Sequence, residues 1–217
     1  MIITALKAES SAGKSGRGEQ FRIELSDGSL FSFKNCYLPP EIFNDYLVNL
    51  KEAEGREINT EEEEAFRFAS SCLRTEKAAL RLIARAEQNT QGLTRKLEQR
   101  GCGRTCVNTV IERLTDLKLL DNRRYAQLWF ESRLRLARSP KRLLYALCGR
   151  GIDRDDAEAA LKAALDKDTE HAMITRFVKK HSRKKGGEGE NHARSLRHLL
   201  KSEGFSLSAI EGFFDAG

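Results

Sequence analysis

Three glycines about fifty residues apart, Gly101, Gly151 and Gly204, constrain the fold of this chain more than any other feature. The same residue types recur around each of them. A leucine lies four residues before each glycine, an apolar residue follows it directly, and a residue accepted at a helix N-cap comes second after it. Apolar residues then follow six, nine and ten positions after each glycine. Self-similarity at this period predicts tandem helical repeats.

The central copy, residues 120–165, predicts three helices joined by short turns. Ser139 followed by Pro140 is typical of a helix start. Gly151 is typical of a helix end, because glycine takes the left-handed conformation there without steric cost. The expected apolar faces of the three helices are, in order, Tyr125, Leu128 and Trp129; Leu143, Leu144 and Leu147; and Ala157, Ala160, Leu161 and Ala164.

The N-terminal region has a different pattern. Apolar and polar residues alternate over 21–25 and 30–34 around Asp27-Gly28, which predicts a β-hairpin, and residues 2–6 are the expected third strand. Residues 10–20 predict a flexible turn. Gly13-Lys14-Ser15 within it matches a phosphate-binding loop only in part, because Ala8 stands where that motif needs a glycine and no helical pattern follows. We expect no nucleotide site there.

Helical patterns begin after residue 40. Residues 41–50 predict a short amphipathic helix, and Thr60 with Glu63 predicts a capping box for a helix that buries Phe66, Ala69 and Leu73. A separate helix is expected over residues 76–87, as the first of repeat one. Residues 186–191, GGEGEN, predict an exposed loop in repeat three.

These patterns predict an all-α protein with three tandem three-helix repeats in an elongated, curved array, preceded by a small N-terminal β-hairpin or sheet. No apolar run is long enough to span a membrane, and the first residues lack the features of a secretory signal. Five cysteines without a CxxC pair indicate reduced thiols in the cytoplasm. The expected segments are 1–38 for the hairpin, 39–64 for an acidic helix and linker, and 65–118, 119–168 and 169–217 for the repeats.

Charge is distributed unevenly along the chain. The net charge is +6, yet residues 41–64 are acidic and the second and third repeats are strongly basic. This asymmetry predicts one face that binds a polyanion. The candidate binding residues are Arg123, Arg124, Arg133, Arg135, Arg138, Lys141, Arg142, Arg150, Lys179, Lys180, Arg183, Lys184, Lys185, Arg194 and Arg197.

Simpler explanations stand beside these candidates. The cations also fit a solvated surface with local pairs, such as Arg124 with Asp121. Trp129 is expected in the core, whereas Tyr145 lies on the more exposed side of its helix and is compatible with stacking on a base. The four histidines come without a nucleophile, a metal motif or paired carboxylates. We therefore expect no enzyme activity, no catalytic residue, no metal and no cofactor.

The run LDNRRYA at residues 120–126, followed by Arg133, Arg142-Leu143 and Arg150-Gly151-Ile152, resembles the central motif of the RecX family, bacterial regulators of the RecA recombinase. The resemblance covers residues 65–165 well and 169–215 more loosely. Two departures, Asn122 for an acidic residue and residues 137–140 for a Gly-rich link, lie at helix starts, where the residues present can still cap. Upstream, Ala79-Leu80 to Arg85, Lys96-Leu97 and Arg100-Gly101 fit the first repeat of that family.

The resemblance implies a cytoplasmic monomer of three-helix repeats that lodges in the groove of a RecA–DNA filament. It further implies that the protein lowers ATP hydrolysis and strand exchange by that filament, in homologous recombination, DNA repair and the SOS response. Direct contact with single- or double-stranded DNA is compatible with it, and no membrane partner is expected. One alternative is a general basic nucleic-acid-binding protein without a recombinase partner; another is an adaptor that uses the acidic N-terminal helix.

Overall fold

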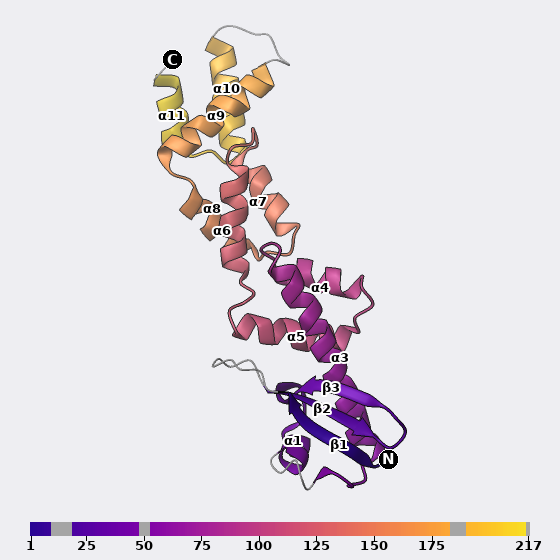
Figure 1. The fold of residues 1–217 in the computed structure, drawn as a ribbon. Helices are drawn as coiled ribbons and strands as arrows, with labels where there is room; N and C mark the ends of the chain where they lie inside the picture. Colours follow the sequence, from indigo (N-terminus) through magenta and orange to yellow (C-terminus); the bar gives the residue numbers. More distant parts are fainter. Residues whose placement is uncertain (10–18, 48–52, 183–189, 216–217) are drawn as a thin grey trace. The chain divides into compact units, whose positions relative to one another are not determined.

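The computed structural model describes residues 1–9, 19–47, 53–182 and 190–215 and is mostly helical, with a small antiparallel sheet near the N-terminus (Figure 1). The strands are β1 (Ile3–Glu9), β2 (Gln20–Leu25) and β3 (Leu30–Lys34). A short 3-10 helix, η1 (Asn35–Tyr37), follows them. The α-helices are α1 (Pro40–Leu47), α3 (Thr60–Ile83), α4 (Thr90–Glu98), α5 (Arg104–Asp116), α6 (Asn122–Arg133), α7 (Pro140–Cys148), α8 (Arg154–Ala164), α9 (Lys167–Ser182), α10 (Glu190–Ser202) and α11 (Leu207–Asp215).

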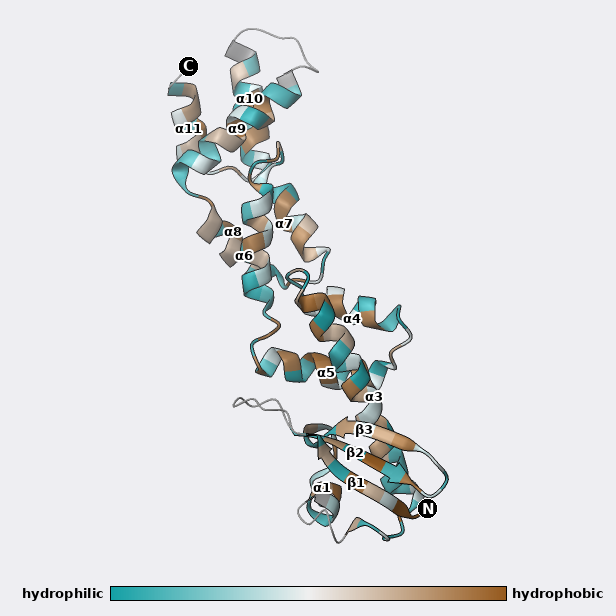
Figure 2. Cartoon of the chain, viewed as in Figure 1, coloured by the Kyte–Doolittle hydropathy of each residue, from teal (hydrophilic) through white to brown (hydrophobic). Residues whose placement is uncertain are grey.

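The chain forms two compact units. Unit 1 comprises residues 1–87 and 93–120, and unit 2 comprises residues 88–92 and 121–217. Each unit has its own cluster of buried apolar side chains. In Figure 2, hydrophobic and hydrophilic residues alternate along α3, α5 and α6, as expected for helices with one buried and one exposed face. Within the described residues, no helix combines the length and apolarity that a membrane crossing requires.

The sheet of unit 1 confirms the predicted hairpin and third strand. Its order is β1-β2-β3, with antiparallel pairing on both sides of β2. Along β2, Phe21, Ile23 and Leu25 are buried while the residues between them are exposed, which matches the alternation in the sequence. Helix α3 covers the buried face, where the rings of Phe33 and Phe66 lie 5.3 Å apart.

Helix α3 differs from its prediction in two respects. The expected helices over residues 60–75 and 76–87 are one continuous helix from Thr60 to Ile83, because buried residues recur in one helical register from Phe66 to Leu82 and no glycine or proline interrupts them. The capping box is also one residue earlier than predicted. Asn59 is the N-cap; its side chain accepts from the Glu62 amide at 2.9 Å, and Glu62 accepts from the Asn59 amide at 2.8 Å.

A buried ion pair joins the sheet to α3. The Nζ atom of Lys34 lies 2.8 Å from the carboxylate of Glu76, and the two side chains are 13% and 3% exposed. Burial, together with this nearby carboxylate, raises the pKa of Tyr37 on η1. Nothing in the sequence pattern predicts the pair, because its partners are 42 residues apart.

The glycine-based predictions are confirmed in both units. Gly101, Gly151 and Gly204 follow α4, α7 and α10 with φ angles of +80°, +83° and +86°. Gly103, Asp153 and Ser206 then begin α5, α8 and α11, and the leucines four residues before each glycine are fully buried. The wider expectation, three equivalent repeats in one curved array with the segment boundaries given above, stays a prediction.

The apolar face predicted for α6 is partly wrong. Leu128 is 47% exposed and Tyr125 is half-buried, whereas Ala126, Trp129 and Phe130 face the core of unit 2. The buried face is rotated toward Ala126 and Phe130, four residues apart, which share one buried cluster with Ala157 and Ala160 of α8, the helix packed against α6. The small side chain of Ala126 permits this close approach.

Two predicted loops fall largely outside the described residues. Of the flexible turn over residues 10–20, positions 10–18 lie outside them, including Gly13-Lys14-Ser15. Of the loop over 186–191, positions 186–189 lie outside them, and α10 already begins at Glu190. Residues 48–50 of the predicted helix 41–50 also lie outside, and α1 ends at Leu47.

Candidate functional site

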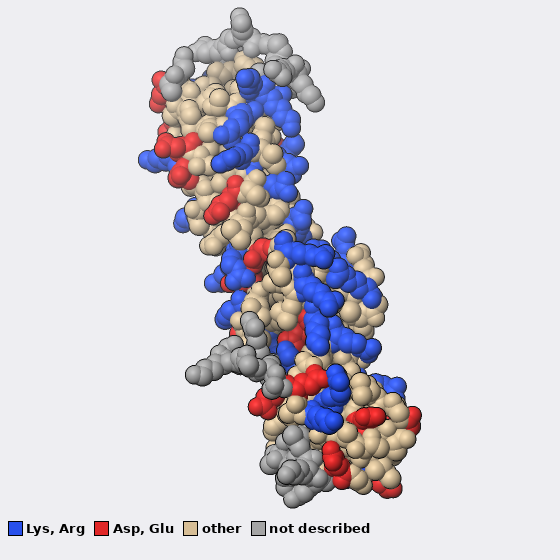
Figure 3. Space-filling view, viewed as in Figure 1, with Lys and Arg blue, Asp and Glu red and all other residues tan. Residues whose placement is uncertain are grey.

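The candidate cations of unit 2 lie on α6, α7, α9, α10 and the turns between them. Most are exposed, and Arg124 is half-buried. Arg183, Lys184 and Lys185 lie outside the described residues. Figure 3 shows Lys and Arg side chains gathered over α9 and α10 on one face of this unit. The exposed members are Arg123, Arg133, Arg135, Arg138, Lys141, Arg142, Arg150, Lys179, Lys180, Arg194 and Arg197.

The start of α6 fixes its first cations. Asp121 is the N-cap, and its side chain accepts hydrogen bonds from the backbone amides of Arg123 and Arg124 at 2.9 and 3.1 Å. The guanidinium of Arg123 reaches α8, where its Nε lies 2.7 Å from Asp156. That hydrogen bond raises the pKa of Arg123. The side chain remains 80% exposed, so this pair adds little to stability and leaves Arg123 accessible to a partner.

Two arginines converge on the indole ring of Trp129. The guanidinium carbons of Arg133 and Arg150 lie 5.8 and 5.7 Å from the ring centroid, within the range of a cation–π contact. Trp129 is only 9% exposed, as predicted for a core residue. The carbonyl of Arg150 also accepts a hydrogen bond from Asn89 at 2.7 Å. Both guanidinium groups therefore lie against the buried ring of Trp129, while both arginine side chains are exposed to solvent.

The start of α7 contacts the end of α10. Ser139 caps α7 and donates a hydrogen bond to Glu203, whose carboxylate also lies 3.5 Å from Nε of Arg142. Lys141 donates from its backbone amide to the Glu203 carbonyl at 3.1 Å and from Nζ to the Ser202 carbonyl at 3.2 Å. Arg133 and Arg150 therefore share the ring of Trp129, whereas Lys141 and Arg142 lie at the end of α10.

The third group of helices holds its cations through similar contacts. The guanidinium carbon of Arg197 lies 4.1 Å from the ring centroid of Phe214. Arg176, which the candidate set omits, donates from Nη1 to the carbonyl of Leu134 at 3.0 Å and so connects α9 to the end of α6. Nothing in the sequence predicts this contact, because Arg176 and Leu134 lie 42 residues apart.

Tyr145 lies on α7, the helix that also carries Lys141 and Arg142, and its side chain is 59% exposed.

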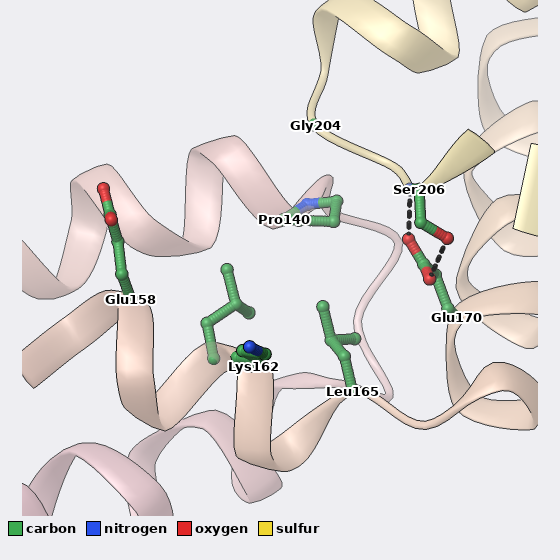
Figure 4. A pocket seen from close by; sticks show the side chains of 8 residues that line it. Pro140, Glu158, Lys162, Leu165, Glu170, Gly204 and Ser206 are labelled. Carbon is green, nitrogen blue, oxygen red and sulfur yellow. Dashed lines mark hydrogen bonds between the residues drawn. The ribbon is translucent and has the colours of Figure 1, made fainter. Parts of the chain in front are cut away.

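A cavity of about 320 Å³ in unit 2 is lined by residues of α7, α8, α9 and the turn before α11 (Figure 4). Its acidic side chains are already engaged. Glu170 accepts hydrogen bonds from the amide and the hydroxyl of Ser206 at 2.6 and 2.7 Å, and Glu158 pairs with Arg154 at 2.7 Å. In the parts of the chain that the structure describes, no group of three His, Cys, Asp or Glu side chains is placed to hold a metal ion. The cavity therefore lies between helices of unit 2, and both carboxylates that line it already have partners.

Comparison with known proteins gives consistent matches. The family model for the second three-helix domain of RecX matches residues 121–161. Regulatory protein RecX of Treponema pallidum (strain Nichols) is 33% identical over 144 residues, which cover 66% of this chain and 85% of that protein. Regulatory protein RecX of Pseudomonas fluorescens (strain SBW25) is 37% identical over 86 residues, which cover 40% of this chain and 56% of that protein.

Two solved structures share the fold. A crystal structure of regulatory protein RecX matches with a TM-score of 0.69 at 18% sequence identity and covers 99% of this chain and 98% of its own. The crystal structure of RecX from Lactobacillus salivarius matches with a TM-score of 0.55 at 20% identity, covering 68% of this chain and 97% of its own.

Proposed function

This chain belongs to the RecX family of regulatory proteins, and from that membership we propose that it regulates a RecA-type recombinase by binding the recombinase–DNA filament. Binding mainly inhibits the ATPase and strand-exchange activities of the filament. The protein acts as a binding partner and not as an enzyme. The match to the second three-helix domain supports this proposal, because it covers α6 to α8, where candidate cations are concentrated.

The observation that carries the proposal is the fixed presentation of cations by consecutive helices of unit 2. Arg133 and Arg150 rest on Trp129, Arg142 lies beside Glu203, and Arg197 rests on Phe214. Side chains that are already ordered lose less conformational entropy when a partner binds. Arginine is also the cation best suited to carboxylates and phosphates, through its planar set of donors. A polymer that carries such anions at intervals fits this surface better than a small ligand.

We further propose that α3–α5, α6–α8 and α9–α11 are copies of one three-helix repeat. The shared glycines, caps and buried leucines support this interpretation. The two copies in unit 2 would then present cations to successive subunits of the filament.

The ATPase rate of a cognate recombinase on single-stranded DNA tests the proposal. The rate should fall when the protein is added at substoichiometric to equimolar amounts. The double substitution Arg133→Glu and Arg142→Glu should weaken this inhibition. Helicity should stay nearly unchanged and the melting temperature should fall only modestly, because both side chains are exposed and only the contact of Arg142 with Glu203 becomes repulsive. A matched reversal on the outer face of the sheet, Lys7→Glu and Arg22→Glu, should inhibit like the unmodified protein.

An ATPase rate that does not change at any ratio of the two proteins would contradict the proposal. DNA affinity that falls steeply with salt, without any binding to the recombinase, would instead support the general nucleic-acid-binding alternative. Equal loss of inhibition in the two double variants would show that net charge, and not the surface of α6 and α7, is responsible.

A further inference from the structure

A row of cations follows the exposed side of the second half of α3. It consists of Arg74, Lys77 and Arg81 on the helix and Arg85 in the turn that follows, and we call it the α3 stripe. Intervals of three, four and four residues place successive members on one helix face. The opposite face of α3 is buried in unit 1, so the direction of the stripe is fixed. Figure 3 shows Lys and Arg side chains gathered where Figure 1 places this part of α3 and α4.

The stripe is not neutralised by its surroundings. Arg74 donates to the hydroxyl of Ser71 at 3.1 Å, and Lys77, Arg81 and Arg85 make no ion pair or hydrogen bond through their side chains to any residue that the structure describes. Near the start of the same helix, by contrast, Arg67 pairs with Glu63. The candidate cations of unit 2 differ as well, since several of them contact a carboxylate or an aromatic ring.

We propose that the α3 stripe binds the phosphate backbone of duplex DNA directly, without the recombinase. This inference goes beyond the function proposed above and does not depend on it. Side chains three and four residues apart on a helix lie roughly 5–6 Å from one another, so the stripe extends along roughly 16 Å of helix axis. A duplex carries one negative charge per about 1.7 Å of its axis, so a row of this length can face several phosphates at once.

The composition of the stripe favours duplex DNA over other polyanions. Single-strand binding surfaces combine cations with aromatic side chains on which bases stack, and the cores of protein interfaces are rich in aromatic and apolar residues. The stripe offers neither. Within the described residues of unit 1, the exposed large hydrophobic side chains are Met1, Ile2 and Leu30, all in or beside the sheet. Contacts that consist of cations alone hold a phosphate backbone without reading its sequence.

Fluorescence anisotropy of a labelled duplex of random sequence, titrated with the full chain, tests the inference. The test variant carries Lys77→Gln, Arg81→Gln and Arg85→Gln, which preserve helix-forming side chains. The control carries Lys7→Gln, Arg22→Gln and Arg67→Gln, which remove the same charges from exposed positions elsewhere in unit 1. Between about 50 and about 200 mM salt, the slope of log affinity against log salt should become shallower by about 2.7 in the test variant.

We expect duplex binding to weaken roughly tenfold or more in the test variant at the lower salt concentration, and to change much less in the control. Equal binding by the test variant and the unmodified chain would overturn the inference. Equal losses in the test variant and the control would also overturn it, because the effect would then follow net charge. Unchanged duplex binding with loss of ATPase inhibition would assign the stripe to the protein partner instead.

A charge-conserving variant guards against a folding artefact. Arg81→Lys with Arg85→Lys keeps both positive charges and should bind the duplex nearly as well as the unmodified chain. Loss of binding in this variant, with an unchanged melting curve, would contradict a backbone contact that depends on charge alone.

Discussion

Two features of the structure require glycine at position 151, its backbone conformation and the close approach of Gln91. The φ angle of Gly151, +83°, is strained for any other residue, and a Cβ atom there would lie 2.0 Å from Oε1 and 2.7 Å from Cβ of Gln91. Gly101 has the same backbone conformation with nothing within 4 Å. We expect Gly101→Ala to lower the free energy of unfolding by about 1–2 kcal/mol and Gly151→Ala to lower it by more.

Chemical denaturation of the two variants measures this difference. A double-mutant cycle with Gln91→Gly should show a favourable coupling with Gly151→Ala and none with Gly101→Ala. Equal costs at the two glycines would mean that backbone strain alone sets the penalty at Gly151.

The buried ion pair of unit 1 gives a second expectation at this scale. In Lys34→Met, the carboxylate of Glu76 loses its cation while its side chain stays 3% exposed, so we expect a loss of about 3–5 kcal/mol. Adding Glu76→Leu removes the uncompensated charge and should restore most of the lost stability. Thermal unfolding measures the stability of the single and double variants. A double variant no more stable than Lys34→Met would show that the ion pair itself stabilises unit 1.

At the scale of the element, the start of α3 can be tested directly. Asn59 accepts the hydrogen bond from the Glu62 amide, whereas Thr60 is the first residue inside the helix. We expect Asn59→Ala to cost about 1 kcal/mol and Thr60→Ala to cost less, because only the first removes an N-cap acceptor. Melting curves of the two variants measure these costs. A larger cost for Thr60→Ala than for Asn59→Ala would support the capping box predicted from the sequence.

The sequence carried enough information for helix ends but less for helix faces and continuity. Glycines and caps act through a few local bonds, so Gly151 and Asp153 could be placed before the structure was known. The continuity of α3 and the exposure of Leu128 depend on which neighbours pack where, and local periodicity cannot decide that. For the same reason, the sequence does not predict the Lys34–Glu76 pair.

At the scale of the whole molecule, the density of basic residues along the chain predicts where a polyanion binds. Density points to the second and third repeats and overlooks Lys77, Arg81 and Arg85, which are spaced out among apolar residues that face the core. Their intervals of four residues, which place them on one helix face, are nevertheless visible in the sequence.

One proposed cationic surface in each unit implies two activities that should separate. We expect the α3-stripe variant to lose duplex binding and to keep ATPase inhibition, because the inhibitory contacts are proposed for unit 2. The variant with Arg133→Glu and Arg142→Glu should show the opposite pattern. Parallel anisotropy and ATPase titrations compare them, and joint loss of both activities in either variant would show that the chain has one binding surface rather than two.

Trp129 is the chain's single tryptophan, and two of the exposed guanidinium groups lie over its ring. The protein therefore carries an intrinsic optical reporter at the surface where a partner is proposed to bind. An anion that draws Arg133 or Arg150 away from the indole alters the electric field at the ring and shifts its emission, so association can be followed without attaching a dye.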